Sequence, residues 1–194
     1  MLDAAQVRAY AEADFSEPHD HFVALLQDRL SPLPETGHAL DLGCGPGDIS
    51  FRFAAALPGW SVDGIDASPP MLEIAKRRLR GSPLEARIAF QEGMLPVEKL
   101  PRDSYDLFFS NSLLHHLPDP AILWSTIDRF AGSESRVFVM DLLWPESQDA
   151  AKALVNRYAG AEPEVLRTDF YNSLLAAYRL EEIGDQLKLA GLSS

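Results

Sequence analysis

Short apolar runs alternate with longer helical stretches through the middle of the chain, and this alternation is its most constraining feature. The strand-type runs occupy residues 38–43, 61–66, 86–91, 105–111 and 136–142. Between them, stretches with helical periodicity occupy residues 49–59, 69–81 and 119–132. Repeated strand–helix–strand units are right-handed crossovers, which make the strands parallel and place helices on both faces of the sheet. The sequence therefore predicts an α/β protein, a three-layer αβα sandwich with a mainly parallel sheet.

The flanking segments are both predicted to be helical. Residues 1–31 precede the first strand, with a break in the helical pattern at residues 16–20, and residues 145–194 follow the fifth strand. No internal repeat or low-complexity linker divides the chain, so we expect residues 1–194 to form one domain.

Charge and cysteine content exclude several classes of protein. The chain has 17 Lys and Arg against 29 Asp and Glu, a net charge of −12, which repels phosphate backbones and anionic membranes. We predict no nucleic-acid or membrane partner, and interpret the basic run at residues 76–80 as a solvated helix face. Cys44 is the only cysteine, so neither an internal disulfide nor a multi-thiol metal site is possible. Because the sequence also shows no signal-peptide pattern and no apolar run of about 20 residues, we expect a cytoplasmic protein.

A glycine-rich loop follows the first predicted strand, in the segment HALDLGCGPGD at residues 38–48. Gly43, Gly45 and Gly47 allow positive φ and close approach of a ligand to the backbone. No Gly-Lys-Ser/Thr follows, so the loop is not a P-loop, and its third glycine comes one residue too early for Gly-x-Gly-x-x-Gly. Asp66 ends the second strand, about 20 residues later, where a carboxylate binds ribose hydroxyls in dinucleotide-binding folds. The loop therefore predicts a ligand with a ribose but without a critical phosphate.

With this loop the sequence resembles the class I, Rossmann-like S-adenosylmethionine-dependent methyltransferases, and within them the branch called methyltransferase type 11. The resemblance rests on LDLGCGPGD, GIDASPPMLEIAKRRL, FQEGMLPVEKLP and YDLFFSNSLLHHLPDP, with a weaker echo in LKLAGL. It implies S-adenosylmethionine as the cofactor and S-adenosylhomocysteine as the product. It also implies that residues 38–141 form the cofactor-binding core, residues 1–31 a helical lid, and residues 145–194 a helical segment on the substrate side.

The resemblance assigns a cofactor role to residues at the ends of three strands. The glycines would line the methionine and ribose parts, Asp66 would bind the ribose, and residues 93–95 would form one wall of the adenine site. Many relatives have an aspartate where this chain has Met94. The complete cofactor-binding set is Asp41, Gly43, Cys44, Gly45, Gly47, Asp66, Ala67, Met71, Gly93, Met94, Leu95 and Asn111. Within it, Cys44 is interpreted mainly as a small side chain that fills the loop.

Methyl transfer is an in-line displacement, so the protein aligns the acceptor and removes its proton where necessary. The candidate catalytic residues are His115, His116 and Asp141, for which both a base and a purely structural role stay open. The candidate acceptor-side residues are Tyr10, Phe15, Trp144, Tyr171 and Asn172. We predict no metal site, because the histidines in SEPHDH at residues 16–21 lie two apart and do not share a helix face. A helix start is the favoured interpretation of that segment.

The function predicted is methyl transfer to a small-molecule acceptor. A non-catalytic S-adenosylmethionine-binding module is one alternative, and a nicotinamide-dependent oxidoreductase, which the early third glycine disfavours, is another. Family members usually finish the sheet with two more strands, whereas residues 187–192 have the pattern of a helix end, so we expect those C-terminal strands to be missing here. The fifth strand is apolar on both faces, and at an open edge it could pair with a second chain.

Overall fold

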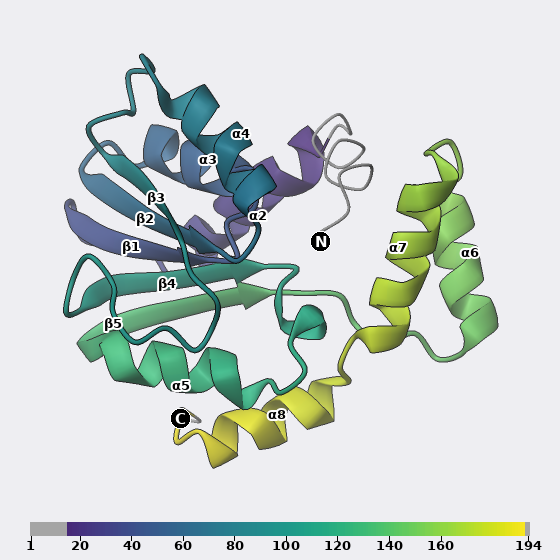
Figure 1. Ribbon diagram of the computed structural model, residues 1–194. Helices are drawn as coiled ribbons and strands as arrows, with labels where there is room; N and C mark the ends of the chain where they lie inside the picture. The colour runs from purple at the N-terminus through teal and green to yellow at the C-terminus, as the bar shows by residue number, and fades with distance from the viewer. Residues whose placement is uncertain (1–14, 193–194) are drawn as a thin grey trace.

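The computed structural model describes residues 15–192 and contains a five-stranded, fully parallel sheet (Figure 1). Its strand order is β3-β2-β1-β4-β5, with every neighbouring pair parallel. The strands are β1 Gly37–Leu42, β2 Trp60–Asp66, β3 Ile88–Glu92, β4 Tyr105–Asn111 and β5 Ala131–Met140. The chain runs outward from β1 in one direction through β2 and β3, and in the other through β4 and β5. The carboxyl ends of β1 and β4 therefore flank the topological switch point, where such sheets bind ligands.

Helices cover both faces of this sheet, which confirms the three-layer prediction. The helices are α2 Ser16–Arg29, α3 Asp48–Ala56, α4 Pro69–Leu79, the 3₁₀ turn η1 Leu114–His116, α5 Ala121–Phe130, α6 Gln148–Tyr158, α7 Glu164–Ala176 and α8 Leu180–Leu189. Helices α2, α3 and α4 lie on one face, and α5 and α8 lie on the other (Figure 1). Each face of the sheet has its own hydrophobic core, and consecutive residues of β4 pack into opposite ones. Phe109 packs with α2, α3 and α4, and Phe108 packs with α5 and α8. This alternation is the period-two geometry of a strand buried on both sides.

Helices α6 and α7 form a pair beyond the carboxyl ends of β4 and β5 (Figure 1). They have a small apolar cluster of their own, centred on Ala151, Val155 and Leu174. Helix α7 also contacts η1, which directly follows β4. The pair therefore stands at the edge of the sheet where the glycine loop lies. None of the helices in residues 15–192 has the length and apolarity that a membrane crossing requires.

The N-terminal segment differs from the prediction in one respect. Residues 16–20 do not interrupt a helix; they form the first turn of α2, which runs without a break to Arg29. Pro18 is tolerated there because an N–H in the first turn of a helix has no intrahelical partner to lose. The expected helix start is confirmed, and the expected break was wrong.

Strand β5 also differs from the prediction. It begins at Ala131, directly after α5, five residues before the predicted start. Its apolar residues are half-buried rather than fully buried, because in the described part of the chain β4 is its one strand neighbour. Arg136 ties this edge strand to the rest of the molecule, since its guanidinium donates to the carbonyls of Leu30 and Pro32 after α2.

Candidate functional site

The glycine loop leaves the carboxyl end of β1 and turns directly into α3. The N–H groups of Gly43 and Cys44 both donate to the carbonyl of Ile65, at 2.9 and 3.0 Å, which fixes the loop against β2. The N–H of Gly47 donates to the Cys44 carbonyl at 2.9 Å, closing a tight turn. Gly43, Gly45 and Gly47 have φ of 76°, 53° and 84°, in the left-handed region that disfavours other residues.

The three glycines differ in what surrounds them. A Cβ on Gly43 would lie 2.9 Å from Leu113 Cδ1, and a Cβ on Gly47 would lie 2.6 Å from Phe90 Cζ. A Cβ on Gly45 would meet no atom within 4 Å. Two glycines are therefore required by internal packing, whereas Gly45 presents bare backbone to open space. This is the arrangement expected where a ligand lies against the chain.

The carboxylate of Asp66 is fixed beside Gly45 at the end of β2. Its Oδ2 accepts a hydrogen bond from the Gly45 N–H at 2.8 Å, and its Oδ1 accepts one from the Ser68 N–H at 2.7 Å. Each carboxylate oxygen has two lone pairs, so each retains one for a further donor. Asp66 is half-buried and reachable. It can therefore accept from two adjacent hydroxyl groups, as the sequence predicted for a ribose.

Asp41 lies beneath the loop and is almost completely buried, with 3% of its surface exposed. Burial raises the pKa of its carboxyl to about 7, the hydrogen bond from Ser50 opposes the rise, and the negative charge of Asp66 adds to it. The Ser50 hydroxyl donates to Asp41 Oδ2 at 2.5 Å. Asp41 is thus a carboxyl group that changes its charge close to neutral pH.

Cys44 is buried inside the same loop. Burial raises the pKa of its thiol well above the usual range, and the carboxylates of Asp41 and Asp66 raise it further. A thiol held in its neutral form is a weak nucleophile. Its side chain packs near Gly64, in keeping with the predicted filling role.

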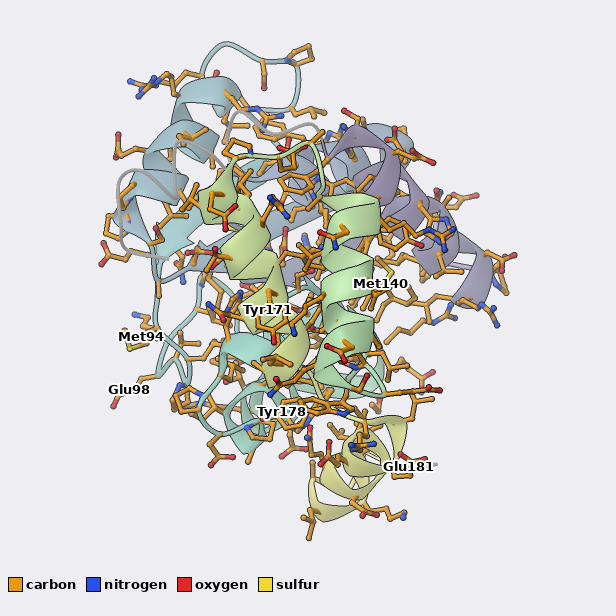
Figure 2. The ribbon with its side chains drawn as sticks, turned by 90° about the vertical axis from the view of Figure 1, so that its right-hand side faces the viewer. Met94, Glu98, Met140, Tyr171, Tyr178 and Glu181 are labelled. Atoms are coloured by element: carbon orange, nitrogen blue, oxygen red, sulfur yellow. The ribbon has the colours of Figure 1, made fainter. Side chains whose placement is uncertain are left out.

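The predicted adenine-side residues flank Asp66. Met71 is buried on α4, Ala67 is exposed, and Leu95 is half-buried. The Gly93 N–H donates to the Asp66 carbonyl at 3.0 Å, so the segment after β3 is anchored to the end of β2. Met94 is 76% exposed, and Figure 2 shows its side chain at the margin of the molecule.

The ends of β4 and β5 are joined across the predicted site. Asn111 closes β4 opposite Met140, the last residue of β5. Ser112, with φ of 54°, turns the chain sharply, and its N–H donates to the Met140 carbonyl at 2.9 Å. This turn carries the backbone from β4 into η1, so that the histidines come to lie beside the residue that follows β5.

The structure brings His115 and Asp141 into contact there. Nδ1 of His115 lies 2.5 Å from Asp141 Oδ1, and the His115 side chain is 2% exposed. Asp141 Oδ2 also accepts from the Leu114 N–H at 2.7 Å, and Oδ1 from the Leu142 N–H at 2.7 Å. Nε2 of His115 is buried and has no hydrogen-bond partner.

His116 differs from His115, although the two rings are in contact, with centroids 4.0 Å apart and planes tilted by 44°. No hydrogen bond of the His116 side chain to Asp141 is formed, and the residue is exposed. Desolvation lowers the pKa of His116, and the neighbouring His115 lowers it further. The charges of Asp169 and Asp141 act in the opposite direction and raise it.

The predicted acceptor-side residues fall into separate groups. Trp144, half-buried after β5, has a buried Nε1 without a hydrogen-bond partner. Tyr171 packs into the apolar cluster between α6 and α7, and Asn172 on the same helix is exposed. Phe15 contacts the His19 ring at a centroid distance of 5.6 Å, next to the start of α2. Tyr10 lies outside the described residues.

Tyr178 is not among the site residues predicted from the sequence, and the structure places it beside Trp144. Its carbonyl accepts from the Trp144 N–H at 3.1 Å, and the segment pairs with Leu143 in an isolated parallel bridge. Burial raises the pKa of the Tyr178 phenol, as do the nearby charges of Asp119, Glu182 and Asp141. Figure 2 shows Tyr178 below Tyr171. A single bridge between distant segments leaves no periodic pattern that a sequence analysis could find.

No group of three or more His, Cys, Asp and Glu side chains within residues 15–192 is placed to hold a metal ion.

Comparisons with known proteins bear on this site. The model of the family described as "Methyltransferase domain" matches residues 40–136, which include the glycine loop, Asp66 and His115. A trans-aconitate 2-methyltransferase from Methylobacterium nodulans is 32% identical over 167 residues, covering 85% of this chain and 58% of that protein. The chain therefore spans little more than half the length of that relative.

Two further comparisons cover a larger share of the matched protein. A ubiquinone biosynthesis O-methyltransferase from Bordetella pertussis is 29% identical over 224 aligned positions, covering 92% of this chain and 89% of that protein. The crystal structure of a SAM dependent methyltransferase from Aquifex aeolicus superimposes with a TM-score of 0.72 at 17% identity, covering 98% of this chain and 89% of that chain. At this identity the superposition bears on the fold alone.

Proposed function

Because this chain belongs to the methyltransferase-domain family, we propose that it binds S-adenosylmethionine at the glycine loop and transfers the methyl group to a small-molecule acceptor. The observation that carries the proposal is the pairing of Asp66 with Gly45. A carboxylate that keeps one lone pair on each oxygen for a further donor stands beside Gly45, where an added Cβ would meet no atom within 4 Å. This combination fits a ribose whose attached groups lie flat against the loop.

The residues present fit the cofactor on chemical grounds as well. S-adenosylmethionine supplies a methyl group on a positively charged sulfonium. Asp66 gives the loop a local negative potential, to which Asp41 adds when it is ionised, and among residues 15–192 no Lys or Arg hydrogen-bonds or pairs with either carboxyl group. In this proposal the cofactor-binding set keeps the roles predicted from the sequence, with Asp66 on the ribose and Asp41 near the amino group.

On the acceptor side we place the groups that border η1, the segment after β5, and α7. They include His115, His116 and Asp141, with Trp144 at the start of the β5–α6 connection. Their task is to orient the acceptor, exclude water and take up a proton where the acceptor must lose one. In this proposal the helical segment of residues 145–192 covers the acceptor side. A lid function of residues 1–31, a cytoplasmic location, and pairing of two chains through the β5 edge stay predictions.

The comparisons support a small-molecule acceptor without naming it. The two curated relatives are named for trans-aconitate and for ubiquinone biosynthesis. The strongly acidic composition supports the same choice against nucleic acid. A non-catalytic binding module would share the loop and Asp66 but would show no acceptor-dependent turnover, and a nicotinamide-dependent oxidoreductase would prefer a different cofactor.

Calorimetric titration tests the proposal. We expect the wild-type protein to bind S-adenosylmethionine and S-adenosylhomocysteine but not NAD. In Asp66→Asn, the amide N–H₂ group faces one of the two backbone N–H donors, and the charge is lost. A hydrogen bond to a charged group contributes about 1.5–3 kcal/mol, so the affinity for the cofactor should fall about tenfold or more. Asp28→Asn, an exposed residue at the far end of α2, is the matched control and should bind normally. Preference for NAD, or equal affinity of the Asp66 variant, would refute the proposal.

A further inference from the structure

We propose that Arg78 is a positioning residue of the cofactor site, because its guanidinium holds the part of the glycine loop that leads into α3. The inference rests on the proposed function, which assigns the cofactor to that loop. It also separates Arg78 from the basic run at residues 76–80, which the sequence predicted as a solvated helix face. Arg77, its neighbour on α4, is exposed, and its side chain has no hydrogen bond or ion pair among residues 15–192.

The first observation is the set of contacts that one guanidinium makes. Nη1 of Arg78 donates to Asp48 Oδ1 at 2.7 Å and, in a longer bond of 3.4 Å, to the carbonyl of Pro46. The guanidinium carbon also lies 4.8 Å from the centroid of the Phe51 ring, a cation–π distance. Pro46 and Asp48 are the residues directly before and after Gly47. Arg78 therefore contacts the chain on both sides of that left-handed glycine.

The second observation is what lies against Gly47. The rings of Phe51 and Phe90 are in contact, with centroids 5.8 Å apart. A Cβ on Gly47 would lie 2.6 Å from Phe90 and 3.2 Å from Phe51, so the glycine packs directly against both rings. Arg78 contacts one of these rings. The guanidinium thus reaches Gly47 through Phe51 as well as through the chain on either side.

The third observation is how the work is divided along the loop. The bonds of Gly43 and Cys44 to the Ile65 carbonyl, and of Gly45 to Asp66, tie the first half of the loop to β2. The contacts of Arg78 fix the second half, from residue 46 to residue 48, against α4. Gly45 stands where the two halves meet and has no packing of its own. Its place relative to a ligand therefore depends on both sets of contacts.

The consequence is expected in ligand affinity more than in stability. The side chains of Arg78 and Asp48 are 44% and 28% exposed, and exposed ion pairs contribute little to folding. A glycine-rich loop that loses one brace spends less time in the shape that binds the ligand. The apparent dissociation constant then rises in inverse proportion to the remaining fraction. Lysine keeps the charge, but it lacks the planar fork that bonds two acceptors and stacks on a ring.

Calorimetric titration of S-adenosylmethionine and S-adenosylhomocysteine tests the inference. Arg78→Gln should weaken both ligands by the same factor, about fivefold, because the ion pair and the cation–π contact are each modest. Arg78→Lys should lie between this variant and the wild type. Arg77→Gln, the same change one residue away, is the matched control and should bind like the wild type. In thermal unfolding, Arg78→Gln should stay within about 4 °C of the wild type.

An NMR measurement reports on the loop itself. In the ligand-free protein, the amide resonance of Gly45 should shift or broaden in Arg78→Gln and stay unchanged in Arg77→Gln. Saturation with S-adenosylhomocysteine should return it to the position found in the saturated wild type. This recovery is expected if the variant changes how often the loop has its binding shape and leaves the shape itself intact.

The inference is overturned if Arg78→Gln keeps the wild-type affinity or the wild-type Gly45 resonance, or if Arg77→Gln loses as much affinity. It also fails if Arg78→Gln weakens S-adenosylhomocysteine but not the positively charged S-adenosylmethionine, since the lost charge would then explain the result. Should Arg78→Gln not fold, Arg78→Lys decides, and wild-type affinity in that variant refutes the positioning role. If the wild type binds neither ligand, the proposed function itself fails.

Discussion

Replacing Asp41 by asparagine should stabilise the fold, and should do so increasingly as the pH rises. Asp41 is buried, and its pKa is raised from 3.8 to about 7 in the folded protein. Between these two values the folded state holds a proton that the unfolded state has already released. The free energy of unfolding therefore falls as the pH rises through this window, and levels off above about pH 7. Asparagine carries no charge at any pH and can still accept the hydrogen bond of Ser50.

The magnitude follows from the width of that window. A shift of about three pKa units, at 1.36 kcal/mol each, corresponds to about 4 kcal/mol over the whole range. Part of this is already lost at pH 5, so about 2.5 kcal/mol remains between pH 5 and pH 8. For a chain of 194 residues, 1 kcal/mol moves Tm by about 2–4 °C. Asp41→Asn should therefore gain about 5–10 °C over the wild type between pH 5 and pH 8.

Thermal unfolding of the ligand-free proteins, followed by circular dichroism from pH 5 to pH 8, measures this difference. Asp28→Asn is the control for the loss of one carboxylate, since Asp28 is exposed, and its difference from the wild type should not change with pH. A constant difference between Asp41→Asn and the wild type, or one that shrinks toward pH 8, would refute the reasoning. It would mean that Asp41 is solvated or paired when the fold is intact.

Three further predictions concern the loop and a helix cap; urea unfolding measures the stabilities, and calorimetric titration measures the ligand affinities. Gly47→Ala should destabilise the fold by about 1–3 kcal/mol, because its Cβ would lie 2.6 Å from Phe90 and φ is positive. Gly45→Ala should cost only about 1 kcal/mol of backbone strain, but should weaken binding of S-adenosylhomocysteine by a larger factor than Gly47→Ala does, since a methyl group would enter the open space; equal effects on affinity would contradict the proposed position of the ligand. Ser147→Ala should cost about 1 kcal/mol, because the Ser147 hydroxyl accepts the N-cap hydrogen bond of α6; an unchanged stability would show that water replaces this cap.

The parts of the fold that follow from local pattern were predictable. The alternation of strands and helices, the position of the glycine loop and the placement of Asp66 at the end of β2 all depend on residues close together in the sequence. They are confirmed as elements because strand periodicity, glycine conformation and helix signals act locally. The expected break at residues 16–20 was wrong because these residues form the first turn of α2, where Pro18 loses no intrahelical hydrogen bond.

The contacts that complete the acceptor side were not predictable. His115 and Asp141 lie 26 residues apart, and their contact depends on the register that sets Asn111 opposite Met140 and on the turn at Ser112. Such a register is a property of the assembled sheet. The same holds for the half-burial of β5, which depends on what lies beside the strand and not on its own apolar residues.

The central claim is that the glycine loop and Asp66 hold S-adenosylmethionine, and a crystal structure of the protein with S-adenosylhomocysteine tests it most directly. The account predicts the ligand against Gly45, with both ribose hydroxyls within hydrogen-bonding distance of the Asp66 carboxylate and the thioether sulfur on the side of η1. A ligand bound elsewhere, or a ribose that makes no contact with Asp66, would contradict it.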